Sequence, residues 1–260
     1  MSIIIKTQKE IEILREGGKR LASVLHKVKE KVKPGVSAKE LDDYAVKLIS
    51  EMGDTPAFLN YQPEGADKPY PASLCVSVND EVVHGIPRED NILKEGDIVS
   101  IDLGLKHYGL FTDMAMTVPV GAISPASERL LDVTKKALEV GISVARAGNT
   151  VGDIGYAIEH FIRSQKNGQQ YGIVEVLSGH GVGRYIHEDP YIPNFGKKGQ
   201  GEKLIPGMVV ALEPMINNGT KHVTLDEDGY TIRTADGKRS AHFEHTILIT
   251  ENEPEILTKI

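Results

Sequence analysis

Cysteine is nearly absent from this chain, because Cys75 is the single one among 260 residues. One cysteine excludes an intrachain disulfide and any zinc module built on cysteine pairs. Apolar runs of the roughly 18 residues that a membrane span requires are also missing. The N-terminal apolar run Ile3–Ile5 is too short for a signal peptide, and no cleavage site follows it. We therefore expect a cytoplasmic protein.

Positive charge is scarce as well. The chain carries 30 Lys and Arg against 37 Asp and Glu, a net charge of −7, and it has no basic run. DNA and anionic membrane surfaces attract basic patches, so we expect neither as a partner. With 40% hydrophobic and 26% charged residues, the composition is that of an ordinary globular protein. No linker-like stretch interrupts residues 1–260, which are expected to form a single domain.

Four helix-start signals divide the chain. Thr7 and Ser37 each lie three residues before a glutamate, which is the pattern of a capping box. Ser124-Pro125 puts proline at the first position of a third helix, and Thr150 opens a fourth. The helices are expected to end near residues 32, 52, 146 and 165, and strands are expected at 74–78, 81–83, 208–216, 222–226, 229–233 and 240–250.

Residues 97–116 have the pattern of a β-hairpin. Apolar and polar residues alternate before turn-forming residues 106–109, and a second run follows. If the turn centres between residues 107 and 108, Asp102 faces Asp113 across the hairpin. Opposed carboxylates repel each other, so such a pair requires either a proton on one of them or a cation between them.

The chain also contains a weak internal repeat. The repeated segments are 32–37 with 145–150, 81–87 with 184–190, and 93–102 with 204–213. Two copies at so long a period do not make a solenoid. We expect two halves, about 7–120 and 121–250, related by a pseudo-twofold axis. Such an axis would set Asp102 opposite Glu213, and His84 opposite His187.

Four carboxylates and one imidazole form a candidate metal site, comprising Asp102, Asp113, His180, Glu213 and Glu244. Buried together and unpaired, ionised carboxylates would be costly, and two divalent cations would balance their charge. This ligand set suits Mn²⁺, Fe²⁺, Co²⁺ or Zn²⁺. Each signal is weak alone, so the hypothesis depends on their joint occurrence. His84 and His187 lie beside this candidate site. We interpret Cys75 as a small apolar filler and six other histidines as structural, namely His26, His107, His160, His222, His242 and His245.

Seven motifs from the beginning to the end of the chain carry a family resemblance. They are His84-Gly-Ile-Pro, Ser100-Ile-Asp-Leu-Gly, Phe111-Thr-Asp-Met, Ser178-Gly-His-Gly-Val-Gly, His187-Glu-Asp-Pro, Leu212-Glu-Pro-Met and His242-Phe-Glu-His-Thr. In order and spacing the set resembles the methionine aminopeptidases, in their short type I form, over about residues 6–257. The resemblance implies an α+β pita-bread fold, with two pseudo-twofold-related halves around a central antiparallel sheet and helices on its outer face.

The resemblance also implies roles for the candidate site. Two metal ions, of Co, Mn, Fe or Zn, would be held by Asp102, Asp113, His180, Glu213 and Glu244. Asp113 and Glu244 would bridge them, and Glu213 would also shuttle a proton from the metal-activated water. His84 would contact the scissile amide nitrogen and His187 the carbonyl oxygen.

The same resemblance implies an apolar pocket for the methionine side chain. Its expected lining is Phe58, Tyr61, Tyr70, Cys75, Ile186 and Tyr230. Phe58 stands where a smaller residue is common in the family, and the loop between Tyr61 and Tyr70 is longer than usual. The expected substrate is the N-terminal methionine of nascent chains near the ribosome, with a small second residue, and the expected enzyme is a monomer. The alternatives are an X-Pro aminopeptidase or prolidase, and a non-catalytic pita-bread protein that binds peptides.

Overall fold

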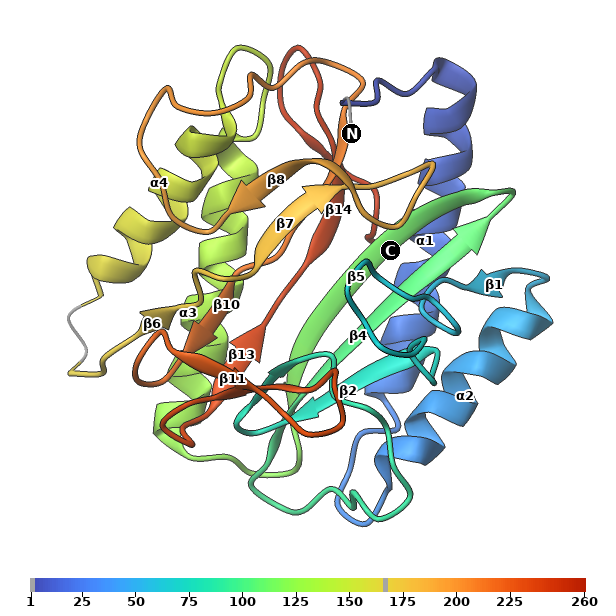
Figure 1. The fold of residues 1–260 in the computed structure, drawn as a ribbon, viewed down its shortest axis with the longest axis vertical. Helices are drawn as coiled ribbons and strands as arrows, with labels where there is room; N and C mark the ends of the chain where they lie inside the picture. Colours follow the sequence, from blue (N-terminus) through green and yellow to red (C-terminus); the bar gives the residue numbers. More distant parts are fainter. Residues whose placement is uncertain (1–2, 166–167) are drawn as a thin grey trace.

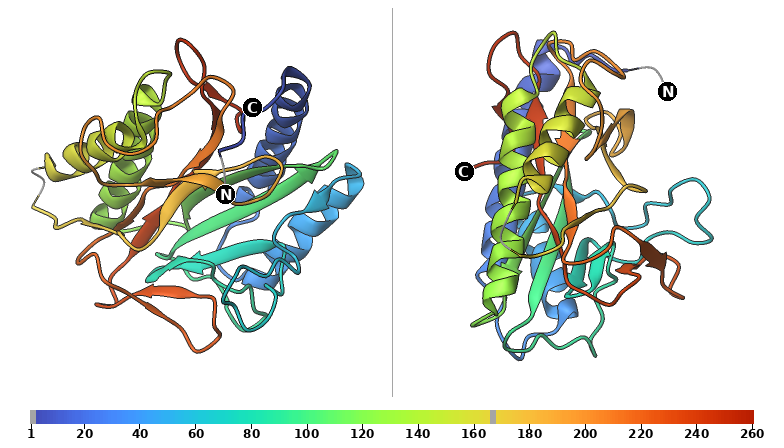
Figure 2. Two further views of the ribbon diagram at one scale, coloured as in Figure 1. Left: turned by 45° about the horizontal axis from the view of Figure 1, so that its top comes forward. Right: turned by 90° about the vertical axis from the view of Figure 1, so that its left-hand side faces the viewer.

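The computed structural model describes residues 3–165 and 168–260, and its four helices cover one side of the strands. The helices are α1 (Gln8–Lys29), α2 (Ala38–Glu51), α3 (Pro125–Val144) and α4 (Val151–Arg163). Seen edge-on, they lie on one side and the long loops on the other (Figure 2). Within the described ranges, no helix is both long enough and apolar enough to traverse a bilayer.

The expected helix starts are confirmed, and their ends come slightly early. Both predicted capping boxes form, at Thr7 and at Ser37, and Thr150 forms a third with Asp153. The four helices stop at residues 29, 51, 144 and 163 rather than 32, 52, 146 and 165. Helix ends depend on tertiary contacts and fray by a residue or two.

The strands form four small sheets, in which all pairs are antiparallel. In the first half, β4 (Ile98–His107) pairs with β1 (Thr55–Pro56), β2 (Leu74–Val78) and β5 (Leu110–Pro119). The second half has a five-stranded sheet in the order β15 (Glu255–Ile256), β14 (His245–Leu248), β9 (Val209–Leu212), β7 (Ser178–Gly181), β8 (Glu188–Pro193). Two three-stranded sheets complete the fold: β13 (Ser240–His242), β10 (Met215–Asn217), β6 (Gly172–Ile173), and β11 (Val223–Leu225), β12 (Ile232–Thr234), β3 (Glu81–Val83).

The hairpin is present, but the predicted register is wrong by two residues. Its turn is Tyr108-Gly109, with φ of 44° and 86°, so Asp102 lies opposite Ala115 and Gly104 opposite Asp113. Side chains alternate between the faces of a strand, so a shift of two keeps both aspartates on one face. They are therefore diagonal neighbours rather than directly opposed.

Two expected long strands are each broken in the middle. Residues 208–216 form β9 and β10, and residues 240–250 form β13 and β14, so each chain segment passes from one sheet into another. The pairing on either side of the breaks is Leu212 with His245 and Met215 with His242. Continuing that register through the breaks sets Glu213 across from Glu244. Both glutamates thus lie in irregular backbone between sheets.

The internal repeat is visible in equivalent hydrogen bonds. The N–H of Leu93 donates to the carbonyl of Val36, and the N–H of Leu204 donates to that of Asn149. The isolated bridges Ser37↔Ile92 and Thr150↔Lys203 form a second equivalent pair. Helices α1 and α2 cover the first-half strands and α3 and α4 the second-half strands (Figure 1).

The two halves meet where β5 runs beside β13 and β14. The Thr246 hydroxyl donates to the carbonyl of Asp113 and accepts from its N–H, at 2.8 and 2.9 Å. The Thr117 hydroxyl makes the same double contact with the backbone of His242, at 2.8 Å each. The N–H of Glu244 donates to Ala115. These contacts fix the hairpin carboxylates relative to those of the second half.

Candidate metal centre

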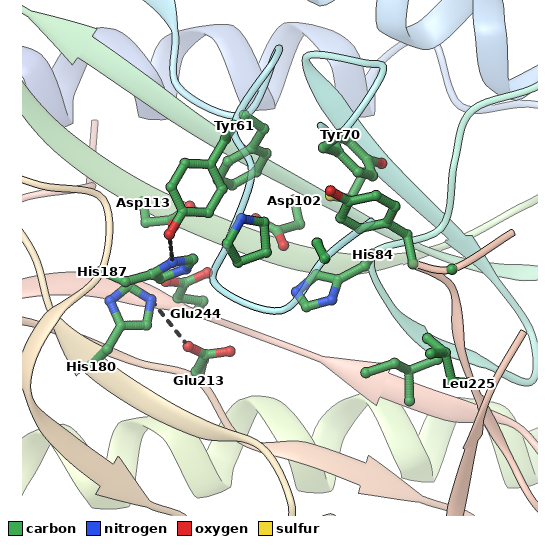
Figure 3. A pocket seen from close by; sticks show the side chains of 17 residues that line it. Tyr61, Tyr70, His84, Asp102, Asp113, His180, His187, Glu213, Leu225 and Glu244 are labelled. Atoms are coloured by element: carbon green, nitrogen blue, oxygen red, sulfur yellow. Dashed lines mark hydrogen bonds and ion pairs between the residues drawn. The ribbon is translucent and has the colours of Figure 1, made fainter. Parts of the chain in front are cut away.

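All five predicted metal ligands line one cavity. Asp102 and Asp113 come from the hairpin, His180 from β7, and Glu213 and Glu244 from the two strand breaks. Figure 3 shows their side chains around one space, with His84 and His187 beside them. The structure thus gathers ligand-type groups that lie as far apart as residues 102 and 244 in the sequence.

The carboxylates in this cavity are held in an environment that opposes their ionisation. Burial and mutual repulsion raise the pKa of Asp113 to about 8, and burial raises that of Glu213 to about 8. Burial, followed by the charge of Asp113 and its neighbours, raises the pKa values of Asp102 and Glu244 well above the ordinary range. A bound cation reverses this situation, because its charge favours the ionised form.

His180 is oriented as a metal ligand would be. Its Nδ1 lies 2.9 Å from the carbonyl of Gly181, which can only accept, so Nδ1 carries the proton. The Nε2 lone pair is left facing the carboxylates, 3.4 Å from an oxygen of Glu213. A backbone carbonyl that fixes the ring and its tautomer is a common second partner of metal-binding histidines. Burial lowers the pKa of His180 to about 3, so the ring stays neutral.

The residues present fit a divalent cation. Ligand atoms of Asp113, His180 and Glu244 lie within 4.8 Å of one another. One oxygen each of Asp102 and Glu244 is buried without a hydrogen-bond partner among the described residues. Buried polar atoms normally have partners, and these two point to a charge that the protein alone does not supply. The donor set of oxygens and one imidazole matches a borderline or hard divalent metal.

His84 carries backbone strain beside this cavity. It follows β3 with a φ of 59°, in a region that residues other than glycine rarely adopt. The next residue must be glycine, since a Cβ on Gly85 would lie 2.3 Å from the carbonyl oxygen of Val76. Such strain persists where surrounding structure imposes it, often at functional sites. Burial lowers the pKa of His84 to about 4, so the imidazole is neutral.

The other wall of the cavity is apolar and aromatic. Five of the six predicted pocket residues line it: Phe58, Tyr61, Tyr70, Cys75 and Tyr230. The rings of Tyr70 and Tyr230 meet edge to face at 5.1 Å. The Tyr70 hydroxyl donates to the carbonyl of Gly85 at 2.9 Å, which ties this wall to the His84 segment. An apolar chamber therefore opens directly beside the carboxylates.

Ile186 differs from the other predicted pocket residues. It does not line this cavity, and instead faces an adjoining one with Tyr61 and His187. A Cβ on Gly104 would meet Phe58 at 2.7 Å and Ile186 at 3.2 Å. Phe58 and Ile186 thus both pack over the bare backbone of Gly104, two residues along β4 from Asp102.

The prediction that His242 is a structural histidine overlooked its contact with the site. Its Nε2 lies 3.4 Å from a carboxylate oxygen of Glu213, and the side chain is buried. The available signal was its place in the same motif as Glu244, two residues before that glutamate. Leu225 and Ile232 also line the cavity, and neither belongs to a sequence motif.

Comparisons with known proteins agree with this geometry. Residues 12–251 match metallopeptidase family M24. The methionine aminopeptidase of Aquifex aeolicus is 46% identical over 266 aligned residues, covering 100% of both chains. The crystal structure of methionine aminopeptidase from Thermotoga maritima is similar with a TM-score of 0.93 and 42% identity, covering 100% of both chains. Prolidase from Pyrococcus furiosus is similar with a TM-score of 0.74 and 25% identity, covering 99% of this chain and 66% of the prolidase.

Proposed function

The chain belongs to metallopeptidase family M24, and from this premise we propose that it is a methionine aminopeptidase. It removes the N-terminal methionine of new polypeptides and prefers a small second residue. The observation that carries this proposal is the divided cavity, in which carboxylates and an imidazole form one wall and Phe58, Tyr70 and Tyr230 form an apolar chamber beside them. The expected α+β pita-bread fold is confirmed by the likeness to the Thermotoga maritima enzyme.

The family implies divalent metal cofactors, and we propose two ions. Asp102, Asp113, His180, Glu213 and Glu244 would hold them, with Asp113 and Glu244 shared between the two. When bound, the ions polarise a carbonyl, lower the pKa of water and neutralise developing charge. Mn, Fe, Co and Zn all suit these ligands.

The chain's own residues would then handle protons and orientation. Glu213 would take the proton of the attacking water and pass it to the departing amine. His84 would contact the scissile amide nitrogen, and His187 would donate to the carbonyl oxygen as negative charge develops there. The methionine side chain would lie in the chamber, where its sulfur can contact the rings of Tyr70 and Tyr230.

The setting of this activity is also proposed. The substrates would be nascent chains near the ribosome, in the cytoplasm. The enzyme would act as a monomer, an arrangement that a complete set of proposed ligands within one chain permits. DNA and membranes are not expected as partners, which is supported by the net charge of −7.

The test separates this function from its two alternatives. Protein loaded with Mn²⁺ or Co²⁺ should cleave Met-Ala-Ser at its first bond and leave Ala-Pro intact. Cleavage of Ala-Pro alone would favour a prolidase, although this chain matches only 66% of the Pyrococcus furiosus prolidase. Metal-loaded protein that binds Met-Ala-Ser without cutting it would favour the non-catalytic alternative.

A further inference from the structure

One hydrogen bond joins the aromatic wall to the second catalytic histidine. The Tyr61 hydroxyl lies 2.8 Å from Nδ1 of His187, and the two rings meet edge to face at 5.2 Å (Figure 3). The partners are 126 residues apart in the sequence. The bond therefore links the loop before β2 to the segment that enters β8.

This hydrogen bond has a favoured direction. A phenol is protonated at neutral pH, and burial raises the pKa of Tyr61 further. A neutral imidazole has one nitrogen that donates and one that accepts. The phenolic O–H is the more acidic of the two possible donors, so it donates to the lone pair of Nδ1. The imidazole proton of His187 then resides on Nε2.

The second nitrogen of His187 is free for a substrate. His187 lines both the metal cavity and the adjoining cleft that contains Tyr191 and Met215. Its ring meets His180 edge to face at 4.5 Å. Among the hydrogen bonds of the described residues, none involves Nε2 of His187.

We propose that Tyr61 is a positioning residue for peptide cleavage. By donating to Nδ1 it holds His187 in the tautomer whose Nε2–H can donate to the scissile carbonyl oxygen. This assignment rests on the proposed function, and it gives Tyr61 a role beyond that of an aromatic wall. A wall would need only the ring, whereas a positioning residue needs the hydroxyl, and Tyr61→Phe separates the two.

The kinetic test compares two matched substitutions. Tyr61→Phe in Mn²⁺-loaded protein should lower kcat on Met-Ala-Ser by about three- to tenfold, the effect of one neutral hydrogen bond. The KM should change by less than about twofold, because the lost contact acts in the transition state. Tyr108→Phe, at the hairpin tip with its side chain 84% exposed, should leave both constants unchanged.

A spectroscopic test reads the tautomer directly. In zinc-loaded, ¹⁵N-histidine-labelled protein, the His187 resonances should show Nε2 protonated and Nδ1 unprotonated, and His187→Gln would assign them. Tyr61→Phe should shift this pattern. In a His187→Gln background, adding Tyr61→Phe should have no further kinetic effect, because the coupling of two contacting residues disappears when one is gone.

Several outcomes would overturn the proposal. Protonation of His187 at Nδ1 in the unmodified protein would do so, as would a Tyr61→Phe variant with an unchanged kcat or with only KM raised. A full effect of Tyr61→Phe in the His187→Gln background would also contradict it. In each case an active unmodified enzyme leaves the proposed function standing. An unmodified, metal-loaded protein that fails to cleave Met-Ala-Ser would refute that function instead, whatever the tautomer.

Discussion

Gly104→Ala should damage methionine binding while sparing the metal site. The added Cβ would lie 2.7 Å from Cε1 of Phe58, 2.8 Å from Cβ of Ala57 and 3.2 Å from Ile186. The N–H of Ala57 donates to the carbonyl of Gly104 at 3.0 Å. That bond anchors the loop backbone against the strand, so the Phe58 ring moves first, whereas relief of the Ala57 contact requires a small shift of the loop backbone itself.

The size of the effect follows from the cost of overpacking. Inserting a methyl group into a well-packed site costs about 1–3 kcal/mol. If the Phe58 ring turns into the apolar chamber, this free-energy cost weakens mainly the binding of substrate. We expect KM for Met-Ala-Ser to rise by about 5- to 150-fold, since each 1.4 kcal/mol is a factor of ten. The kcat should change little.

A second substitution separates this cause from damage to the metal ligands. Gly104 lies opposite Asp113 in the hairpin, so a backbone shift could also displace that carboxylate. Replacing Phe58 with leucine in the Gly104→Ala variant should restore part of the KM, because it relieves the contact with the Phe58 ring and leaves the contact with Ala57. Steady-state kinetics on Met-Ala-Ser, with bound metal measured by elemental analysis, would check it. A KM that the double variant fails to rescue, or a loss of metal in the single variant, would refute the reasoning.

Three further predictions concern the carboxylates and the N-terminal segment. Asp113→Asn or Glu244→Gln should abolish cleavage of Met-Ala-Ser and reduce bound metal; full turnover in both would contradict the ligand assignment. Without metal, Asp113 and Glu213 have folded-state pKa values of about 8, above their unfolded values, so the native state binds more protons than the unfolded state. The Tm should therefore fall as pH rises from about 4 to about 8, that is, from the ordinary carboxyl pKa values of 3.8 and 4.5 to the folded-state values. Scanning calorimetry with and without Mn²⁺ should show this dependence only in the metal-free protein. Lys6 and Glu188 form a buried pair at 2.5 Å with side-chain exposures of 1% and 0%. Lys6→Met should cost about 3 kcal/mol of unfolding free energy, because the buried carboxylate loses its cation and keeps only the backbone N–H donors of Arg184 and Tyr185; urea melts that match the unmodified protein would contradict this.

The sequence determined the features that depend on a few neighbouring residues. Capping boxes at Thr7 and Ser37 involve groups three residues apart, so their pattern alone locates both helix starts. The family's motifs likewise identified the five ligand-type residues, because a motif records residue identities together with their spacing.

Tertiary structure decided the features that depend on where distant segments meet. The hairpin register rests on positive φ angles at Tyr108 and Gly109. Such a turn favours Asn or Gly at its first central position, so tyrosine there gave no signal. The sheet changes at Glu213 and Glu244 follow from pairing with strands elsewhere in the chain, which no local pattern encodes.

The hydrogen bond from Tyr61 to His187 and the packing of Phe58 and Ile186 over Gly104 also arise only in the folded chain. Helix caps and strand alternation act over a few residues. Such local patterns therefore specify which side chains each segment presents. Only the packed fold decides which of them touch. Contacts between segments more than a hundred residues apart depend on the register and on the core that holds both segments in place.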